Sequence, residues 1–539
     1  MTLSIALAQK NWHVGDIEGN VASILQEIKA QSHCDMVVFS ELALCGYPPE
    51  DLIFRKDFQQ RCESQLNLIQ AATQDCAVIV GHPTWQAGVI YNSLSFFYQG
   101  QRLALYHKQQ LANYDVFDEK RYFQVGHTDG IVEFKGVRLG LLICEDLWQD
   151  APVEQLKLHQ IDMLISINAS PYDEQKAAQR LQLMAKQAQK LSVPIVYVNQ
   201  VGGQDELIFD GHSFVCSEKG MPVFSMESFV EKTAIVKFNP QLTVSNPTDE
   251  KHYLNDNRCA DIYDALVLSV RDYVKKNGFE GIVLGLSGGI DSALTLAIAV
   301  DALGKDKAQA VMMPFRYTAD ISIADAREEA ELLGVEFDII SIEPMFDAFM
   351  TQLTPVFAGT EKDTTEENLQ ARCRGVILMA LSNKRRRLVL TTGNKSEMSV
   401  GYATLYGDMA GGFDVLKDVP KTLVFALSRF RNTRSYVIPE RVIIRPPSAE
   451  LAPDQKDEDS LPPYDVLDGI LRGYIEQDLS VEALVVQGYD RQTVLRVIKL
   501  VNINEYKRRQ SAIGPKITVR NLGKGRRYPI TSGFGYKNG

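Results

Sequence analysis

A short polar loop in the second half of the chain has the residue types that bind phosphate groups. Residues 282–286 are apolar, and a helical pattern begins within the six residues that follow, namely Ser287, Gly288, Gly289, Ile290, Asp291 and Ser292. Glycines let the backbone come close to a phosphate, and the free N–H groups of a first helical turn point toward it. A carboxylate at Asp291 would repel that anion, so the sequence predicts a Mg²⁺ ion between them. The loop lacks the lysine of a Walker A motif, and the glycine pair alone would also fit a plain strand-to-helix turn.

Three residues in the first half of the chain could together hydrolyse an amide. Glu41, Lys108 and Cys144 each follow a short apolar run that is typical of a strand. In such a set the carboxylate takes the thiol proton, the thiolate attacks the amide carbon, and the ammonium stabilises the oxyanion. A helix that begins at Cys144 is expected to lower the pKa of the thiol. Taken singly, each residue also fits an ordinary role as a small buried side chain, a cap or a surface ion pair.

The elements that must position these residues alternate between apolar runs and helical patterns. In the first half, helices are expected at residues 20–30 and 172–191, the second one capped by Ser170 and Pro171. Strands are expected at residues 3–9, 36–41, 76–81, 92–100, 102–108, 137–146, 162–170, 193–200 and 211–217. This mixture predicts a layered α/β domain.

A polar stretch rich in Pro, Asn and Asp separates the two halves. We expect a first domain over residues 1–240, a linker over 241–258 and a second domain over 259–539. In the second domain the pattern predicts helices at 259–278, 292–304 and 322–334, and strands at 281–286, 308–315 and 337–342. Such a β-α-β-α-β series winds a parallel sheet whose ligands bind at the carboxyl ends of the strands.

The bulk composition excludes several classes of protein. The 539 residues contain 57 Lys and Arg against 68 Asp and Glu, a formal net charge of −11, which argues against general binding to nucleic acid or anionic membranes. No apolar stretch is long enough to span a bilayer, and no signal peptide is evident. The eight cysteines show no C-x-x-C spacing, so neither a zinc site nor a disulfide framework is predicted. A cytoplasmic protein is expected.

The segment S-G-G-I-D-S, placed between a buried strand and a helix, resembles the signature of the PP-loop ATP pyrophosphatases. That resemblance implies a doubly wound parallel sheet and an enzyme that cleaves ATP to AMP and pyrophosphate while forming an adenylate. Among PP-loop enzymes, the segments E-N-L-Q-A-R, T-G-N-K-S-E, G-D-M-A-G-G and V-P-K-T are similar to those of NAD synthetases. The tRNA-thiolating members fit poorly, since the chain lacks C-x-x-C spacing and a positive net charge.

The resemblance to NAD synthetases implies a set of binding residues in the second half. Asp291 and Glu397 would hold Mg²⁺ against the ATP phosphates, and Lys421 would neutralise charge on the adenylate or on pyrophosphate. Deamido-NAD⁺ would contact Asn368, Glu397 and Lys507. The ATP-binding positions implied are Gly285, Leu286, Ser287, Gly288, Gly289, Ile290, Asp291, Ser292 and Thr392.

The first half is similar to the nitrilase superfamily of carbon–nitrogen hydrolases. The matching patterns are F-S-E-x-x-x-x-G-Y at Glu41, H-K-x-x-L at Lys108 and G-x-x-I-C-E-D at Cys144. The resemblance implies a four-layer α-β-β-α sandwich in which these three residues are catalytic. By position within its glutaminase members, Tyr114, Ser170 and Lys176 would contact glutamine, and Tyr47, Glu145 and Trp148 would lie near the pocket.

The two halves together resemble the glutamine-dependent NAD⁺ synthetases. The reaction implied converts deamido-NAD⁺, ATP and glutamine to NAD⁺, AMP, pyrophosphate and glutamate, with ammonia carried internally and with assembly into homo-oligomers. Two other functions stay open on the residues alone. The first half could be a separate amidase beside a synthetase that uses free ammonium, or the chain could be an inactive nucleotide-binding regulator.

Overall fold

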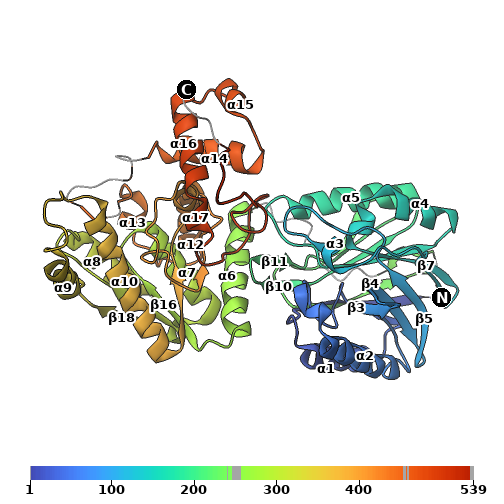
Figure 1. Ribbon diagram of the computed structural model, residues 1–539. Coiled ribbons are helices and arrows are strands. Elements are labelled where there is room, and N and C mark those ends of the chain that lie inside the picture. Colours follow the sequence, from blue (N-terminus) through green and yellow to red (C-terminus); the bar gives the residue numbers. More distant parts are fainter. Residues whose placement is uncertain are drawn as a thin grey trace. The chain divides into compact units, whose positions relative to one another are not determined.

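The computed structural model describes residues 2–239, 241–245, 257–448, 450–452, 457 and 461–534. The chain forms two compact units, residues 1–258 and 259–539 (Figure 1). Within the described residues, no helix is both long and apolar enough to cross a membrane.

Two β-sheets form the centre of the first unit. The larger has the strand order β15-β14-β1-β2-β3-β4-β5, and the smaller has the order β13-β12-β9-β8-β7-β6. The strands of the larger sheet are β1 (Leu3–Gln9), β2 (Met36–Val38), β3 (Ala77–Gln86), β4 (Val89–Tyr98), β5 (Gln101–His107), β14 (Lys232–Phe238) and β15 (Val244–Ser245). Those of the smaller sheet are β6 (Ile131–Phe134), β7 (Val137–Ile143), β8 (Met163–Asn168), β9 (Ile195–Asn199), β12 (Phe214–Cys216) and β13 (Pro222–Ser225). A separate hairpin joins β10 (Val201–Gln204) to β11 (Leu207–Asp210).

Helices cover the outer faces of both sheets, as the alternation of buried side chains requires. Leu3, Ile5 and Leu7 of β1 join the core between the sheets, whereas Ala6 and Ala8 face a second core under the helices. The helices of this unit are α1 (Ile17–Ala30), α2 (Lys56–Ala71), α3 (Glu119–Tyr122), α4 (Asp150–Leu158) and α5 (Lys176–Leu191), with short turns η1 (Glu50–Phe54) and η2 (Cys144–Leu147). Figure 1 shows α1 and α2 on one side and α4 and α5 on the other, which confirms the predicted α-β-β-α sandwich.

The second unit is built on one parallel sheet with the order β18-β17-β16-β19-β20. Its strands are β16 (Gly281–Gly285), β17 (Ala308–Met312), β18 (Glu336–Ile339), β19 (Arg387–Thr391) and β20 (Phe413–Asp414). From β16 the chain winds outward through β17 and β18, and it then returns to add β19 on the other side of β16. This is the predicted doubly wound sheet, and its topological switch point lies between β16 and β19, where open α/β sheets bind ligands.

Helices flank this sheet and form a second core beyond it. The helices are α6 (Arg258–Lys276), α7 (Ile290–Leu303), α8 (Asp320–Leu333), α9 (Glu343–Leu353), α10 (Thr364–Arg385), α11 (Lys395–Val400), α12 (Lys421–Arg434), α13 (Glu440–Ile444), α14 (Tyr464–Leu471), α15 (Val481–Val486), α16 (Arg491–Ile503) and α17 (Glu505–Arg508), with short turns η3 (Lys305–Lys307) and η5 (Arg472–Glu476). Leu467, Leu484 and Val497 pack α14, α15 and α16 into one apolar cluster, which also includes Met398 of α11. Helix α11, which follows β19, therefore packs against α14, α15 and α16.

The expected element boundaries differ from the structure in several places, including the following two. The helix predicted at 172–191 begins at Lys176 with Gln175 at its N-cap position, so Ser170 does not cap it; the Ser170 N–H donates to Asn199 Oδ1 at 2.9 Å. The predicted linker also contains a strand, because β15 pairs with β14 and extends the larger sheet to residue 245. Residues 246–256 of that linker lie outside the described residues.

Candidate active sites

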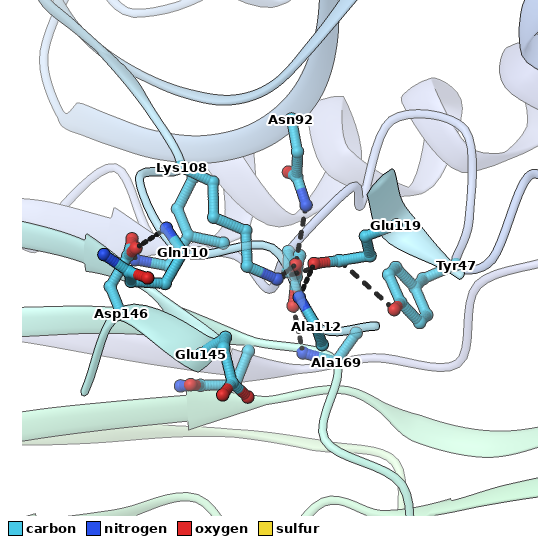
Figure 2. A network of polar contacts seen from close by, with 12 residues as sticks. Tyr47, Asn92, Lys108, Gln110, Ala112, Glu119, Glu145, Asp146 and Ala169 are labelled. Atoms are coloured by element: carbon cyan, nitrogen blue, oxygen red, sulfur yellow. Dashed lines mark hydrogen bonds and ion pairs between the residues drawn. The ribbon is translucent and has the colours of Figure 1, made fainter. Parts of the chain in front are cut away.

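The ends of two strands bring Lys108 and Glu41 together in the first unit. Lys108 follows β5 directly, and Glu41 lies just beyond β2. The Lys108 ammonium is 2.7 Å from Glu41 Oε1 and 2.8 Å from Glu119 Oε1, and all three side chains are buried (Figure 2). Burial disfavours the ammonium charge, but Glu119 and Glu41 outweigh this effect and raise the pKa of Lys108 well above its usual range. The lysine is therefore a fixed cation.

Hydrogen bonds from the backbone and from Asn92 hold the Glu41 carboxylate in one orientation. Asn92 Nδ2 donates to Oε1 at 2.7 Å, and the N–H of Ala169 donates to Oε2 at 2.9 Å. Asn92 lies on β4 of the larger sheet, and Ala169 follows β8 of the smaller one. The two sheets thus fix the proposed base from both sides.

Cys144 begins the turn η2 immediately after β7, in a left-handed backbone conformation with φ +46°. Non-glycine residues pay a strain cost there, and such strain is concentrated at functional sites. Burial and the nearby Glu41 raise the pKa of the thiol well above its usual value, whereas Lys108 lowers it. The expected decrease in pKa from a helix N-terminus is therefore wrong, because η2 is a single short turn and desolvation dominates. The resting group is a thiol that needs a base.

Two of the proposed glutamine contacts, Tyr114 and Lys176, lie near this thiol. Tyr114 OH donates to Glu145 Oε2 at 2.9 Å, and the Lys176 ammonium lies 4.1 Å from the centre of the Trp148 ring. Both Tyr114 and Lys176 are close enough to Cys144 for it to influence their pKa values. Ser170 is buried next to Ala169, so it lies beside the Glu41 contact. A cation at Lys176 and an anion at Glu145 suit a zwitterionic amino acid.

In the second unit, the loop between β16 and α7 forms a compact turn. Ser287 N–H and Ser287 Oγ lie 3.2 and 3.1 Å from Ser292 Oγ, and Gly289 N–H donates to Ser287 Oγ at 3.2 Å. Gly288 has φ +79°, and a Cβ atom there would lie 2.3 Å from the carbonyl oxygen of Ser322. Only glycine fits this position without displacing the backbone.

Two carboxylates and one ammonium meet beside this loop. Lys421 pairs with Asp291 and, at 3.2 Å, with Glu397 Oε1, while Asn394 Nδ2 donates to Asp291 Oδ1 at 2.9 Å. Burial raises the pKa of Glu397 to about 8, although Lys421 opposes the shift. Burial also opposes the charge on Lys421, but Asp291 and Glu397 raise the pKa of its ammonium overall.

A cavity of about 320 Å³ opens at this switch point. Of the residues expected to bind ATP or metal, its wall contains Gly285, Leu286, Ser287, Gly289, Ile290, Asp291, Ser292, Thr392, Glu397 and Lys421. Gly288 does not line the wall, because it packs against Ser322. Asn368 and Lys507 do not line the wall either, but both contact the turn formed by residues 401–404, which is next to the cavity. Thr404 Oγ1 donates to Asn368 Oδ1, and Lys507 donates to the carbonyls of Gly401 and Ala403, all at 2.8 Å.

Comparisons with known proteins agree with this division of chemistry. Residues 4–246 match the carbon-nitrogen hydrolase family model, and residues 262–511 match the NAD synthase model. Relatives named glutamine-dependent NAD(+) synthetase are 49% identical in Acinetobacter baylyi, over 99% of each chain, and 48% identical in Xanthomonas campestris, over 99% of this chain and 98% of the relative. The chain belongs to the glutamine-dependent NAD(+) synthetase family. The solved structure of the Acinetobacter baumannii enzyme in complex with adenosine diphosphate covers 100% of both chains at 46% identity, with a TM-score of 0.81.

The residues of this family member fit a Mg²⁺ ion beside ATP. Asp291 and Glu397 offer hard oxygen ligands at the cavity wall, and Oδ1 of Asp457, another wall residue, is buried with no hydrogen-bond partner among the described residues. Within those residues, no group of three or more acidic, histidine or cysteine side chains could hold a metal alone. Mg²⁺ commonly binds through one or two carboxylates and completes its shell with phosphate oxygens and water.

Several residues at the two candidate sites of this family member were not predicted from the sequence. Glu119 lies in the charged run 118–121, which is typical of a solvated surface, yet its Oε2 accepts the Ala112 N–H at 2.9 Å and burial raises its pKa to about 7. Arg374 and Arg445 line the cavity, and Arg445 donates to the Gly288 carbonyl at 2.7 Å. The Pro-Pro pair after Arg445 indicates an extended segment, but it does not indicate that this segment lies at the cavity.

Proposed function

We propose that this chain is a glutamine-dependent NAD⁺ synthetase, which amidates deamido-NAD⁺ with nitrogen from glutamine and energy from ATP. The observation that carries the proposal is that each half reaction has its own set of converging groups. Glu41, Lys108 and Cys144 gather in the first unit. The Ser-Gly-Gly loop, Asp291 and Lys421 line one cavity in the second.

In the first unit, Glu41 acts as general base and Cys144 as nucleophile. Glu41 takes the Cys144 proton as Sγ attacks the carboxamide carbon of glutamine, and the Lys108 ammonium stabilises the oxyanion. The C–N bond then breaks, and Glu41 returns the proton to the leaving ammonia. Water activated by Glu41 adds to the thioester and releases glutamate. Tyr114, Ser170 and Lys176 hold the substrate, with Glu145 and Lys176 facing its two charged groups.

In the second unit, the chain positions ATP for attack by a carboxylate. N–H groups at the start of α7 bind phosphate oxygens, and the carboxylate of deamido-NAD⁺ attacks the α-phosphorus to give an adenylate and pyrophosphate. Lys421 neutralises charge that develops on the phosphates. When bound at Asp291 and Glu397, Mg²⁺ would supply further charge neutralisation of the phosphates. Thr392 contacts the nucleotide, and Asn368, Glu397 and Lys507 bind the dinucleotide. Ammonia then displaces AMP to form the amide.

We place this activity in the cytoplasm, in keeping with eight unpaired cysteines, and we expect the chain to assemble as a homo-oligomer. Sedimentation velocity of the purified chain tests the assembly.

The decisive experiment follows the amide nitrogen of ¹⁵N-labelled glutamine into NAD⁺. The wild-type chain should incorporate the label and release one AMP for each NAD⁺ formed. Cys144→Ala should abolish incorporation from glutamine and retain synthesis from ammonium, whereas Cys216→Ala, which removes another buried thiol of the same unit, should retain both. Label incorporation by Cys144→Ala would refute the assigned nucleophile. If the wild type formed NAD⁺ from ammonium but not from glutamine, the result would favour an ammonium-dependent synthetase, and the absence of AMP release would favour a nucleotide-binding regulator.

A further inference from the structure

Asp146 makes four hydrogen bonds in the first unit that the proposed reaction does not use. Its side chain is fully buried. Oδ1 accepts the N–H groups of Gln109 and Gln110 at 3.0 and 2.7 Å. Oδ2 accepts the N–H of Ile143 at 3.1 Å and the hydroxyl of Tyr106 at 2.8 Å. Figure 2 shows the contact to Gln110 beside Lys108.

These four donors come from the two strand ends that deliver the proposed catalytic groups. Tyr106 is on β5, and Gln109 and Gln110 follow Lys108 as the chain leaves that strand. Ile143 is the last residue of β7 and precedes Cys144. β5 belongs to the larger sheet and β7 to the smaller one, and among the described residues no strand pairing joins the two sheets. One carboxylate therefore ties the two sheets together at the points where Lys108 and Cys144 leave them.

We propose that Asp146 is a positioning residue that holds the Lys108 ammonium and the Cys144 sulfur at their working separation. This inference rests on the proposed glutaminase function. Asp146 also restrains the strained backbone at Cys144, since its bond to Ile143 N–H fixes the residue before the left-handed turn.

An amide cannot replace this carboxyl group without losing a contact. Three of the four donors are backbone N–H groups, which cannot accept a hydrogen bond in return. A carboxylate offers two accepting oxygens, whereas an amide of the same shape offers one oxygen and an NH₂ group. Asp146→Asn therefore leaves at least one backbone N–H facing a donor and loosens one of the two strand ends.

The pKa of Cys144 reports the separation between the two groups. The charged side chains with the largest effects on its thiol are Glu41, Lys108, Glu119 and Glu145, and among these four Lys108 lowers the pKa, while Lys176 also interacts with the thiol. If Lys108 moves away, the pKa of Cys144 rises. Loss of the Asp146 charge with the geometry unchanged would instead lower the thiol pKa, so the direction of the change separates positioning from a direct electrostatic effect.

The test compares Asp146→Asn with the wild-type chain and with a matched control. Asp162→Asn is that control, because Asp162 Oδ2 also accepts a backbone N–H of β7, from Arg138 at 2.7 Å, at the opposite end of the strand. Three quantities are measured: kcat and KM for glutamine hydrolysis, the rate of Cys144 alkylation by iodoacetamide against pH by peptide mass spectrometry, and NAD⁺ synthesis from ammonium.

We expect Asp146→Asn to lower kcat about 100-fold, the cost of a misplacement of about 1 Å, with KM for glutamine nearly unchanged. The alkylation profile of Cys144 should move to higher pH, and synthesis from ammonium should remain at the wild-type rate. Asp162→Asn should match the wild type in all three measurements.

An unchanged kcat, or an alkylation profile that stays in place or moves to lower pH, would overturn the inference. Loss of glutamine binding by Asp146→Asn in the Cys144→Ala background, measured by calorimetry, would also overturn it, since Asp146 would then serve folding of the unit. Failure of the proposed function is distinguishable, because Cys144→Ala would then still use glutamine.

Discussion

At the scale of single residues, the first unit depends on ionisable groups that fix one another's charge. Lys108 contacts two carboxylates, and only Glu41 has a proposed role as proton acceptor. Glu119 balances the remaining charge and also accepts hydrogen bonds from Ala112 N–H and Tyr47 OH. Because the pKa of Glu119 lies at about 7, its charge is sensitive to small changes around it. The second unit has a similar arrangement, in which the Lys421 ammonium forms ion pairs with Asp291 and Glu397.

Glu119→Gln should lower the rate of glutamine hydrolysis about 10- to 100-fold, within the range ascribed to positioned acid–base groups. With Glu119 neutral, Lys108 pairs with Glu41 alone, which stabilises the Glu41 carboxylate and makes it a weaker base. Glutamate release measures the effect. Glu63→Gln, at an exposed glutamate of α2 that accepts from Gln59, should leave the rate unchanged. A Glu119→Gln rate within twofold of the wild type would contradict this role.

At the scale of elements, both sites lie where strands end and the chain turns sharply. Cys144 follows β7 with φ +46°, and Gly288 follows β16 with φ +79°. Each turn follows the carboxyl end of a parallel strand, the edge of an α/β sheet at which ligands commonly bind. The two turns differ in the space that they leave for a side chain. The turn at Cys144 accommodates a Cβ atom, whereas a Cβ atom at Gly288 would lie 2.3 Å from the carbonyl oxygen of Ser322.

Gly288→Ala should raise KM for ATP at least tenfold, about 1.4 kcal/mol of binding, because the loop must move to relieve the contact with Ser322. Gly304→Ala is the matched control, since Gly304 has φ +87° at the end of α7 but no atom lies within 4 Å of its added Cβ. Both variants place a Cβ at a positive φ, and the resulting backbone strain should be visible in thermal denaturation. Equal KM values for the two variants would show that strain, and not the contact, governs ATP binding.

At the scale of the whole molecule, buried acids make the stability depend on pH. Burial raises the pKa of Glu119 and Asp414 to about 7 and that of Glu397 to about 8. An acid whose pKa is higher in the folded state holds its proton more tightly there than in the unfolded chain. The free energy of unfolding therefore falls as pH rises from the pKa of the acid in the unfolded chain to its pKa in the folded chain. Buried His82, with its pKa lowered to about 4, acts in the opposite direction, but mainly below about pH 6.5.

The unliganded chain should thus lose stability from pH 6.5 to 8, with a slope of up to about 1.4 kcal/mol per pH unit for each proton released. Urea midpoints followed by circular dichroism across this range measure the slope. Glu397→Gln should flatten it, and Glu482→Gln, at an exposed glutamate paired with Arg491, should not. A midpoint that rises with pH in the wild-type chain would contradict the assigned shifts.

The sequence by itself determined the fold class and many strand positions. The period-two pattern of residues 3–9 matches β1 because one side of each strand faces the core between the sheets and the other faces helices. It also placed Glu41, Lys108 and Cys144 at strand ends, and the Ser-Gly-Gly loop between β16 and α7, since local patterns and short motifs record local geometry.

Only the tertiary structure decided which distant groups meet. β14, which pairs with β1 more than 200 residues away, was not predicted, because the exposed lysines Lys232 and Lys237 interrupt its apolar pattern. In the sequence Glu119 resembles a surface residue, and only the fold shows that it pairs with Lys108. The role inferred for Asp146 likewise depends on its contacts with two strand ends that belong to different sheets. The physical reason is that burial and pairing set the charge and orientation of these side chains, and both depend on contacts between segments far apart in the chain.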